Sequence, residues 1–471
     1  MAPTIATRAP SGVAPTSRRA GNVGLWLVML AQLMLVLDST VVNVALPHIA
    51  TDLHFSSSEL SWVLNGYALA FGGLLLLGGR VGDVMGRRRT FLVGVAAFTL
   101  FSLLGGLATS PLLLVIARAL QGLGAAFAAP SVLALITTSA KDEGARNRAL
   151  ALFSAIASMG GALGLILGGV LTDTTNWRWT LFINVPIGAV VLIMVPRLVA
   201  ETPRRTGRFD ILGAVTATGG AVAIVWALIQ APDYGWFSPR TLGGLVVGAV
   251  LLALLAYTER RVAHPLLRPQ LLRSPSRVSA LAAMAATYGG MLAMFFLMVQ
   301  YLEDQLHFSP LVTGLAFLPM PLSIFAMSRI IPRLVERIGA VRLVIIGAAL
   351  RVVAFLPLTQ LGSNTSFALV AVALLFTGIS AGMTFMPLTT LALRNVEPEH
   401  AGSASGLFQT MQQLGGAVGL AIVASTFAAF AVPGDFVTGG RAGFWSATIL
   451  SIVALAAVVG LAVRRNREAS A

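Results

Sequence analysis

The sequence contains no cysteine and very little charge. Of its 471 residues, 18 are acidic and only 11 % are charged. The lack of cysteine excludes disulfides and thiol chemistry. The low charge, with 56 % hydrophobic residues and a mean hydropathy of +0.85, excludes a soluble globular protein. Apolar runs of about 20 residues recur along the chain, which is the length of a membrane-spanning helix. We therefore expect an all-α integral membrane protein.

Lysine is almost absent as well. Lys141 is the only one, and because it follows no glycine-rich loop, the chain lacks the phosphate-binding lysine of nucleotide hydrolases. The five histidines fall in predicted loops without metal-ligand spacing. We therefore expect no enzyme, no cofactor and no metal site. Basic residues that are nearly all arginine are typical of GC-rich bacterial genomes.

The net charge of +14 does not indicate nucleic-acid binding, because the basic residues form short clusters between apolar runs without interleaved aromatics. If both termini are cytoplasmic, nearly all of the 32 basic residues lie on the cytoplasmic side. The exceptions are Arg118 and Arg351 within spans and Arg178, Arg240 and Arg441 outside. The positive-inside rule thus predicts a multi-pass protein of the bacterial plasma membrane with cytoplasmic termini, in contact with the lipid bilayer.

Fourteen membrane helices are predicted. Their ranges are 24–47, 60–79, 89–108, 111–139, 147–172, 178–199, 210–230, 241–259, 278–302, 310–331, 342–361, 366–393, 403–432 and 442–463. Residues 1–23 read as a disordered cytoplasmic tail, because they are rich in Ala, Pro, Thr, Ser and Arg. Residues 466–471 are expected to form a second cytoplasmic tail.

An internal repeat predicts the architecture. DLHFS at 52–56 returns as QLHFS at 305–309, and Arg80, Asp83, Gly86 and Arg89 return as Arg333, Glu336, Gly339 and Arg342, both at an offset of 253. MGGALGL at 159–165 returns as LGGAVGL at 414–420. We expect two homologous six-helix halves, at 24–199 and 277–465, joined by a linker at 200–276 that carries two extra helices. Parallel repeats of this kind are the plan of a secondary transporter with its substrate site near the midplane.

Asp38 is the one acidic residue well inside a predicted span, where a charge is expensive. Helix geometry places it and Arg118 at similar depths below the outer surface. Burial disfavours a charged carboxylate and a nearby arginine favours it, so such a group can bind and release a proton as access alternates. The alternative is a static buried ion pair between the first and fourth helices. The equivalent of Asp38 in the second half is Met291, so no second acid is expected there.

The sequence resembles the major facilitator superfamily, in particular its fourteen-helix drug:proton antiporters of the EmrB/QacA type. The motifs that carry the resemblance are LDSTVVNVALP at 37–47, GRVGDVMGRRR at 79–89, RALQGLG at 118–124, NWRW at 176–179, FINVPIG at 182–188 and FDILG at 209–213. In the fifth helix, Leu165 stands where the antiporter signature has a proline. The resemblance implies that Asp38 couples protons or cationic substrates and that Arg118 takes part in proton transfer.

The motif after the second helix implies a conformational latch. Its members in this chain are Gly79, Arg80, Asp83, Gly86, Arg87 and Arg88, with Glu336 as the counterpart of Asp83. The alternative is a topology determinant that only obeys the positive-inside rule. Because Arg87, Arg88 and Arg89 would suffice for that purpose, the two acids favour the latch.

Glycines recur at helical spacing in the two repeated helices: Gly160, Gly164, Gly168, Gly169, Gly415 and Gly419. Small residues at this spacing let helices pack closely in lipid. Static packing explains any one of them, and as a set we expect them to form a sliding seam between the halves.

Polar, aromatic and methionine side chains within spans are candidates to line a central cavity for varied apolar molecules. They are Asn43, Trp62, Asn65, Tyr67, Gln121, Met291, Phe295, Gln300, Phe408 and Gln412, with Gln32, Asn184, Gln409 and Gln413 as further polar candidates. Interhelical hydrogen bonding or core packing is the alternative for each. Glu303 and Asp304, at the outer end of the ninth helix, are expected to be solvated, with attraction of cations as the alternative.

These features predict a monomeric exporter of hydrophobic and cationic small molecules in exchange for protons. One alternative is an exporter dedicated to a single endogenous metabolite or antibiotic. Another is a membrane sensor that binds such compounds without transporting them.

Overall fold

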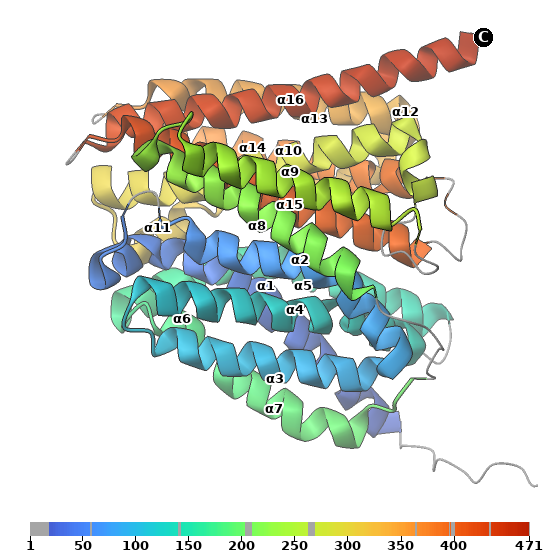
Figure 1. The fold of residues 1–471 in the computed structure, drawn as a ribbon. Coiled ribbons are helices and arrows are strands. Elements are labelled where there is room, and N and C mark those ends of the chain that lie inside the picture. The colour runs from blue at the N-terminus through green and yellow to red at the C-terminus, as the bar shows by residue number, and fades with distance from the viewer. Residues whose placement is uncertain are drawn as a thin grey trace, which may run out of the picture.

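The computed structural model describes residues 18–56, 59–139, 143–202, 210–261, 269–362, 365–394, 396, 401–432 and 435–470. Within these residues the chain is almost entirely helical (Figure 1). The helices are α1 (Arg18–Leu53), α2 (Trp62–Met85), α3 (Arg87–Gly106), α4 (Pro111–Ser139), α5 (Glu143–Thr174), α6 (Trp179–Phe182), α7 (Asn184–Leu198), α8 (Ile211–Tyr234), α9 (Pro239–Thr258), η1 (Pro269–Arg273), α10 (Pro275–Gln300), η2 (Tyr301–Gln305), α11 (Pro310–Ala316), α12 (Pro319–Ile338), α13 (Ala340–Phe355), η3 (Leu356–Gln360), α14 (Phe367–Leu393), α15 (Ala401–Phe430) and α16 (Phe436–Ser470).

Thirteen stretches in the described residues are long and apolar enough to cross a membrane. Four predicted spans are built from two consecutive elements each, namely α6 with α7, α10 with η2, α11 with α12, and α13 with η3. The remaining predicted span corresponds to α5, whose residues 163–174 form a shorter apolar stretch. The protein is a multi-pass membrane protein with the predicted order of helices.

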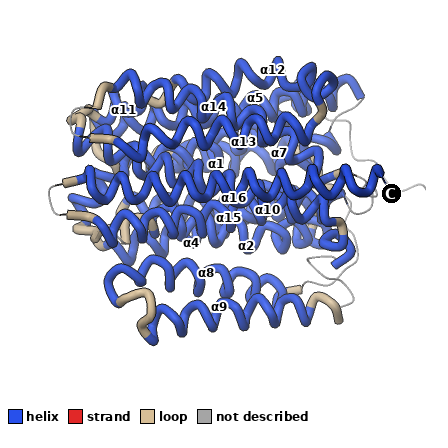
Figure 2. The backbone as a smooth tube through the Cα atoms, turned by 90° about the horizontal axis from the view of Figure 1, so that it is seen from above, coloured by secondary structure: helices blue, strands red, loops and turns tan. Residues whose placement is uncertain are grey.

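The N-terminal half (α1–α7) and the C-terminal half (α10–α16) lie on opposite sides of the bundle (Figure 1). α8 packs against α2 of the first half and α15 of the second, and α9 packs on α8. Figure 2 shows α8 and α9 side by side along one edge of the bundle. The two inserted helices thus cover one of the lines along which the halves meet.

Hydrophobic packing differs between the two ends of the molecule. We name them the outer and cytoplasmic ends, after the orientation predicted from the basic residues. One buried cluster joins outer parts of both halves, including Val44 of α1, Leu165 of α5 and Phe296 of α10. Toward the cytoplasmic end, buried residues form separate clusters in the N-terminal half, around Phe91, and in the C-terminal half, around Met284. The halves are therefore closed against each other at the outer end in this structure.

The repeat is visible in the backbone. Gly86 and Gly339 both have positive φ, 104° and 84°, where α2 turns into α3 and α12 into α13. His54 and His307, also 253 residues apart, have φ values of 58° and 53° after α1 and η2. A non-glycine residue in this region is uncommon, so its recurrence at equivalent positions supports the two-repeat architecture.

Several predicted boundaries need correction. α1 already begins at Arg18, continues through Pro47 to Leu53 and places His48 on a helix instead of in a loop. Proline is tolerated there because a membrane helix can satisfy the one carbonyl that a proline leaves free, here that of Asn43, with nearby groups. α16 continues to Ser470, through most of the predicted tail. The predicted tail at 1–17 lies outside the described residues.

The repeated cytoplasmic motif lies mainly on helices. α2 runs to Met85, so Gly79, Arg80 and Asp83 are helical, and the turn into α3 is made at Gly86. Glu336 is likewise on α12. The predicted end of the second helix at residue 79 is therefore wrong, because the helix continues to Met85 and one glycine with positive φ is sufficient for the turn.

Candidate functional site

Asp38 and Arg118 form a buried ion pair between α1 and α4. Arg118 Nη1 lies 2.7 Å from Asp38 Oδ2, and the side chains of Arg118 and Asp38 are 1 % and 0 % exposed. This is the contact that matching depths in the sequence predicted. A charge isolated from water needs both an opposite charge and hydrogen bonds, and the surrounding side chains supply these.

Two amides complete the shell of the carboxylate. Gln121 Nε2 on α4 donates to Asp38 Oδ1 at 2.7 Å, and Asn184 Nδ2 at the start of α7 donates to the same oxygen at 2.9 Å. Both amides also donate to Ser102 Oγ on α3, which itself donates to the Leu181 carbonyl oxygen. The network connects α1, α3, α4 and the α6–α7 junction.

The guanidinium of Arg118 has three further contacts. Its Nε donates to the Val63 carbonyl oxygen of α2 at 3.1 Å, and Nη1 also lies 2.6 Å from Gln121 Oε1. Its Cζ lies 4.6 Å from the centre of the Tyr67 ring, in cation–π geometry. Every group placed against Asp38 donates a hydrogen bond to it, which matches an ionised carboxylate. Among the described residues, Arg118 is the basic side chain that pairs with Asp38.

Sequence reasoning singled out all of these side chains except Ser102. Gln121, Tyr67 and Asn184 were predicted as cavity residues, and the structure places them around the ion pair. Ser102 gave no signal because a lone serine in an apolar helix is usually satisfied by its own backbone.

Arg351 of α13 is the second buried arginine within a span, at 1 % exposure. Its Nε and Nη2 lie 3.2 and 3.3 Å from the hydroxyls of Ser380 and Thr384, and Nη1 donates to the Thr287 carbonyl oxygen at 2.7 Å. Neither snorkelling nor a hidden carboxylate accounts for it among the described residues. Neutral groups of α10 and α14 hold this cation.

The cytoplasmic motif is bound to the end of the N-terminal half. Arg87 Nη2 pairs with Asp83 Oδ1 at 2.5 Å. The carboxylate of Glu201 accepts from the backbone N–H groups of Arg88 and Arg89 at 2.9 and 3.1 Å, and Thr202 Oγ1 accepts from the N–H of Arg87. An acid at this position satisfies free N–H groups and complements the helix dipole. Glu201 therefore caps α3, a role that its distance in sequence concealed.

The other predicted latch residues have fewer polar contacts in the described structure. Within the described part of the chain, Arg80 and Glu336 belong to no ion pair, and Glu336 is exposed. Gly79 faces only Pro130 of α4, with room for a Cβ atom. The latch stays a prediction, with Asp83, Arg87 and Glu201 as its bonded members in this conformation.

The predicted seam glycines are divided between two kinds of contact. The atoms nearest to Gly160, Gly164 and Gly168 belong to α1 of the same half, and those nearest to Gly415 and Gly419 belong to α10 of theirs. Gly169 alone of the six faces the other half, where a Cβ atom would lie 2.5 Å from the Pro310 carbonyl oxygen of α11. Gly72 of α2, which the sequence did not single out, similarly faces Gln413 of α15. Of the six glycines predicted to form the seam, Gly169 is therefore the one that contacts the other half in this conformation, and the sliding seam stays a prediction.

The NWRW motif ties the outer ends of the N-terminal half together. Trp177 Nε1 donates to Asp52 Oδ2 at 2.9 Å, and Arg178 Nη1 lies 2.5 Å from the same oxygen. Arg178 Nη2 also donates to the Ala108 carbonyl oxygen after α3. The motif thus links the loop before α6 to the end of α1 and to the residues after α3 by hydrogen bonds and an ion pair.

A comparison with protein families agrees with the resemblance that the sequence motifs indicate. The sequence profile described as Major Facilitator Superfamily matches residues 28–420. The chain belongs to the major facilitator superfamily.

Several resistance and export proteins share substantial sequence with it. The puromycin resistance protein pur8 of Streptomyces alboniger is 41 % identical, over 85 % of this chain and 80 % of that protein. The cephamycin export protein CmcT of Amycolatopsis lactamdurans is 38 % identical over 88 % and 87 %. A lincomycin resistance protein of Streptomyces lincolnensis is 34 % identical over 97 % and 96 %.

Solved facilitator structures share the fold. The POT family transporter PepTSo matches with a TM-score of 0.70 at 15 % identity, over 96 % of this chain and 99 % of that one. The nucleoside transporter NupG matches with a TM-score of 0.66 at 14 % identity, over 93 % and 100 %. At this identity the match concerns the fold alone.

The remaining cavity candidates of this facilitator lie in different environments. Asn43 and Gln300 donate to carbonyls of their own helices. Phe295 stacks on Phe317 in the outer cluster, Met291 packs against that cluster, and Phe408 belongs to a cytoplasmic cluster of the C-terminal half. Trp62 packs beside the α2–α8–α15 contact, and Gln412 is half-buried on α15. Asn65 is fully buried, and both polar atoms of its side chain lack a partner in the described structure.

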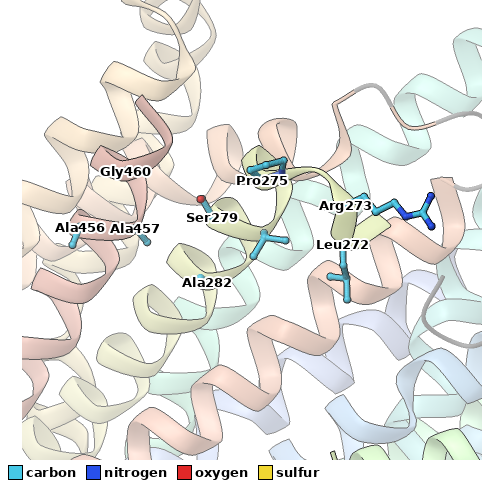
Figure 3. A pocket seen from close by; sticks show the side chains of 9 residues that line it. Leu272, Arg273, Pro275, Ser279, Ala282, Ala456, Ala457 and Gly460 are labelled. Atoms are coloured by element: carbon cyan, nitrogen blue, oxygen red, sulfur yellow. The ribbon is translucent and has the colours of Figure 1, made fainter. Parts of the chain in front are cut away.

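A cavity of about 470 Å³ lies between η1, the start of α10 and α16. Figure 3 shows its wall of small and apolar side chains, including Pro275, Ala282 and Ala457, with Arg273 at one side. None of its lining residues belongs to the Asp38 network or to the predicted cavity set. The cavity is therefore separate from the buried Asp38 network of α1, α3, α4 and α7.

Proposed function

We propose that this protein is an efflux transporter that exports hydrophobic small molecules, cationic ones among them, in exchange for protons. The observation that carries the proposal is the Asp38–Arg118 pair with its shell of Gln121 and Asn184, buried inside a facilitator fold. Sequence similarity to resistance and export proteins supports outward transport of small molecules.

The exchange follows from competition for Asp38. In the present arrangement Arg118 and two amides stabilise the ionised carboxylate. A proton or a cationic substrate that reaches Asp38 takes over the neutralising role of Arg118, and removal of either one restores the ion pair. Because the carboxylate can satisfy one such partner at a time, proton uptake from one side and substrate release to the other become linked.

Alternating access supplies the two sides. The halves are packed together at the outer end and form separate clusters toward the cytoplasmic end, so this conformation corresponds to the state before outward opening. We propose that both termini are cytoplasmic and that a single chain, which holds both halves, is the working unit.

The test is efflux of a lipophilic cationic dye from proteoliposomes with an imposed pH gradient. Wild-type protein should move the dye in proportion to the gradient, and Asp38→Asn should abolish the gradient-driven part. Asp304→Asn is the matched control, because it removes an exposed carboxylate outside the network. Gradient-driven efflux that survives Asp38→Asn would contradict the coupling role.

A second candidate is an exporter dedicated to one antibiotic or metabolite. This candidate is favoured by relatives that are named after a single compound, such as puromycin or lincomycin. Resistance profiles of a sensitive host expressing the protein separate the two: protection against one chemical class supports the dedicated exporter, and protection against several supports the multidrug reading.

A further inference from the structure

The outer end contains a second buried carboxylate. Glu303, in the π-helical turn η2 that follows α10, has a side chain only 6 % exposed. It was expected to be solvated, and the structure contradicts this, whereas its neighbour Asp304 is exposed. π-helical turns are rare and concentrate at functional sites.

The partner of Glu303 comes from the opposite half. Glu303 Oε2 lies 3.4 Å from Nδ1 of His48 on α1. Neither carboxylate oxygen accepts a hydrogen bond within the described structure, and the Thr313 hydroxyl of α11 lies beside the carboxylate without hydrogen-bond geometry. His48, when protonated, is therefore the cation that pairs with this carboxylate. Among the described residues it is also the one ion pair that joins the two halves.

The repeat alone does not produce this contact. At an offset of 253, His48 corresponds to Tyr301 and Glu303 to Ala50, so the symmetry-related positions carry no charge. The outer ends of α1 and α10 meet in either case, because they belong to the same hydrophobic cluster. One ion pair has thus been added to a contact that apolar packing already makes, and the Ser309 hydroxyl also donates across the same contact to Asp173 of α5.

We propose that Glu303 is a second proton-binding site of the transport cycle, and that its pairing with His48 holds the outer end of the two halves closed. The proposal rests on the alternating-access function proposed above. His48 is 45 % exposed and Asp304 is exposed, so water and protons reach the pair from outside. Protonation of Glu303 removes the charge that attracts His48 and frees the halves to separate.

The pH dependence has two limbs. The pair carries opposite charges only while Glu303 is ionised and His48 is protonated. Acid removes the negative charge and alkali removes the positive one, so the outer end is held most firmly at intermediate pH and opens more readily as the outer pH falls. Asp173 of α5 and Asp304 also act electrostatically on His48, and His307 acts on Asp304. These groups modulate the charge of the cluster, while Glu303 makes the contact.

The lack of native cysteine allows a direct test. Leu165 of α5 is 2 % exposed, and its carbonyl oxygen lies against Gly314 of α11 in the other half. In Leu165→Cys, a membrane-impermeant maleimide added outside measures how often the outer end opens. Each rate is divided by that of Phe237→Cys, whose position is 89 % exposed, which cancels the intrinsic pH dependence of the thiol.

The labelling ratio of the otherwise unchanged protein should rise as the outer pH falls. Glu303→Gln should raise the ratio roughly two- to fivefold at neutral pH and remove its acid limb, which is the effect expected of a partly exposed ion pair. His48→Gln, tested as a separate variant, should also raise the labelling ratio at neutral pH, because it removes the other member of the pair. Asp304→Asn, which removes a charge from the neighbouring exposed residue, should change the profile less than Glu303→Gln does and should keep its acid limb.

A Glu303→Gln profile like that of the unchanged protein would overturn the proposal, as would an equal effect of Asp304→Asn or no effect of His48→Gln. The readout needs neither substrate nor proton flux. Absence of gradient-driven efflux would therefore overturn the proposed function alone, and a pH-independent labelling ratio with intact efflux would overturn only the role of Glu303.

Discussion

Among the described residues, Arg118 and Arg351 are the two arginines that are 1 % exposed in the middle of spans, and only Arg118 faces a carboxylate. Arg118 neutralises Asp38, whereas Arg351 is held by two hydroxyls and a carbonyl. The difference matters because an ion pair that loses one partner leaves an uncompensated charge, while a cation that loses its own charge leaves only neutral groups.

We expect Arg118→Gln to destabilise the protein by about 3–5 kcal/mol, since it leaves Asp38 charged and unpaired. Arg351→Gln should change stability by less than about 1 kcal/mol, because an amide can still bond the hydroxyls of Ser380 and Thr384. Thermal unfolding of the detergent-solubilised variants compares the two. An equal loss for Arg351→Gln would indicate that an acidic partner pairs with it in solution.

At this scale the sequence predicted which polar residues lie together in the spans better than it predicted their hydrogen bonds. An acid and a base at matching depth in apolar helices are conspicuous, and so Asp38 and Arg118 could be paired in advance. Ser102 and Glu201 could not, because their partners lie on other helices, up to 113 residues away in sequence for Glu201. Burial of Glu303 was missed because a carboxylate at the end of a span looks solvated until α1 is packed over it.

Helix termini carry much of the organisation between elements. α3 begins directly after the Gly86 turn, and Glu201, at the start of the linker, caps its first free N–H groups. The sequence predicted the turn but placed the end of α2 at residue 79, because charge and glycine resemble a loop. The helix continues because its last turns extend beyond the apolar core, where charged residues remain helical.

Loss of the α3 cap should be measurable. Glu201→Ala is expected to lower the free energy of unfolding by about 1–2 kcal/mol, since several backbone donors at the helix N-terminus lose their acceptor. Glu336→Ala is the control, an exposed acid that belongs to no ion pair in the described residues. Unfolding midpoints should fall for the first variant only; a comparable fall for the second would argue that general surface charge is responsible.

For the whole molecule, closure of the outer end depends on close backbone contact between the halves. A Cβ atom on Gly169 would lie 2.5 Å from the Pro310 carbonyl oxygen and 2.9 Å from Leu311 Cα, whereas one on Gly161 of the same helix would meet nothing within 4 Å. A backbone neighbour cannot rotate away, so the first substitution must separate α5 from α11.

We expect Gly169→Ala to slow efflux roughly tenfold, because a bias of about 1.4 kcal/mol against the closed state is enough for that change. Gly161→Ala should behave as wild type. Initial efflux rates at matched membrane abundance test both. Normal transport by Gly169→Ala would mean that the outer contact seen here is not an obligatory step of the cycle.

The position of α8 gives the two sides of the molecule different relations to the lipid. The halves meet along α2 and α15 on one side and along α5, α11 and α12 on the other. α8 lies over the first line, where Ala221, Val225 and Ile229 pack between the halves, and Ser425 donates to the Leu228 carbonyl oxygen. In the described residues no helix covers the second line in this way. A hydrophobic compound dissolved in the bilayer is thus separated from the α2–α15 line by α8, whereas no such helix separates it from the line along α5, α11 and α12. Lateral entry from the lipid is therefore expected on that second side alone.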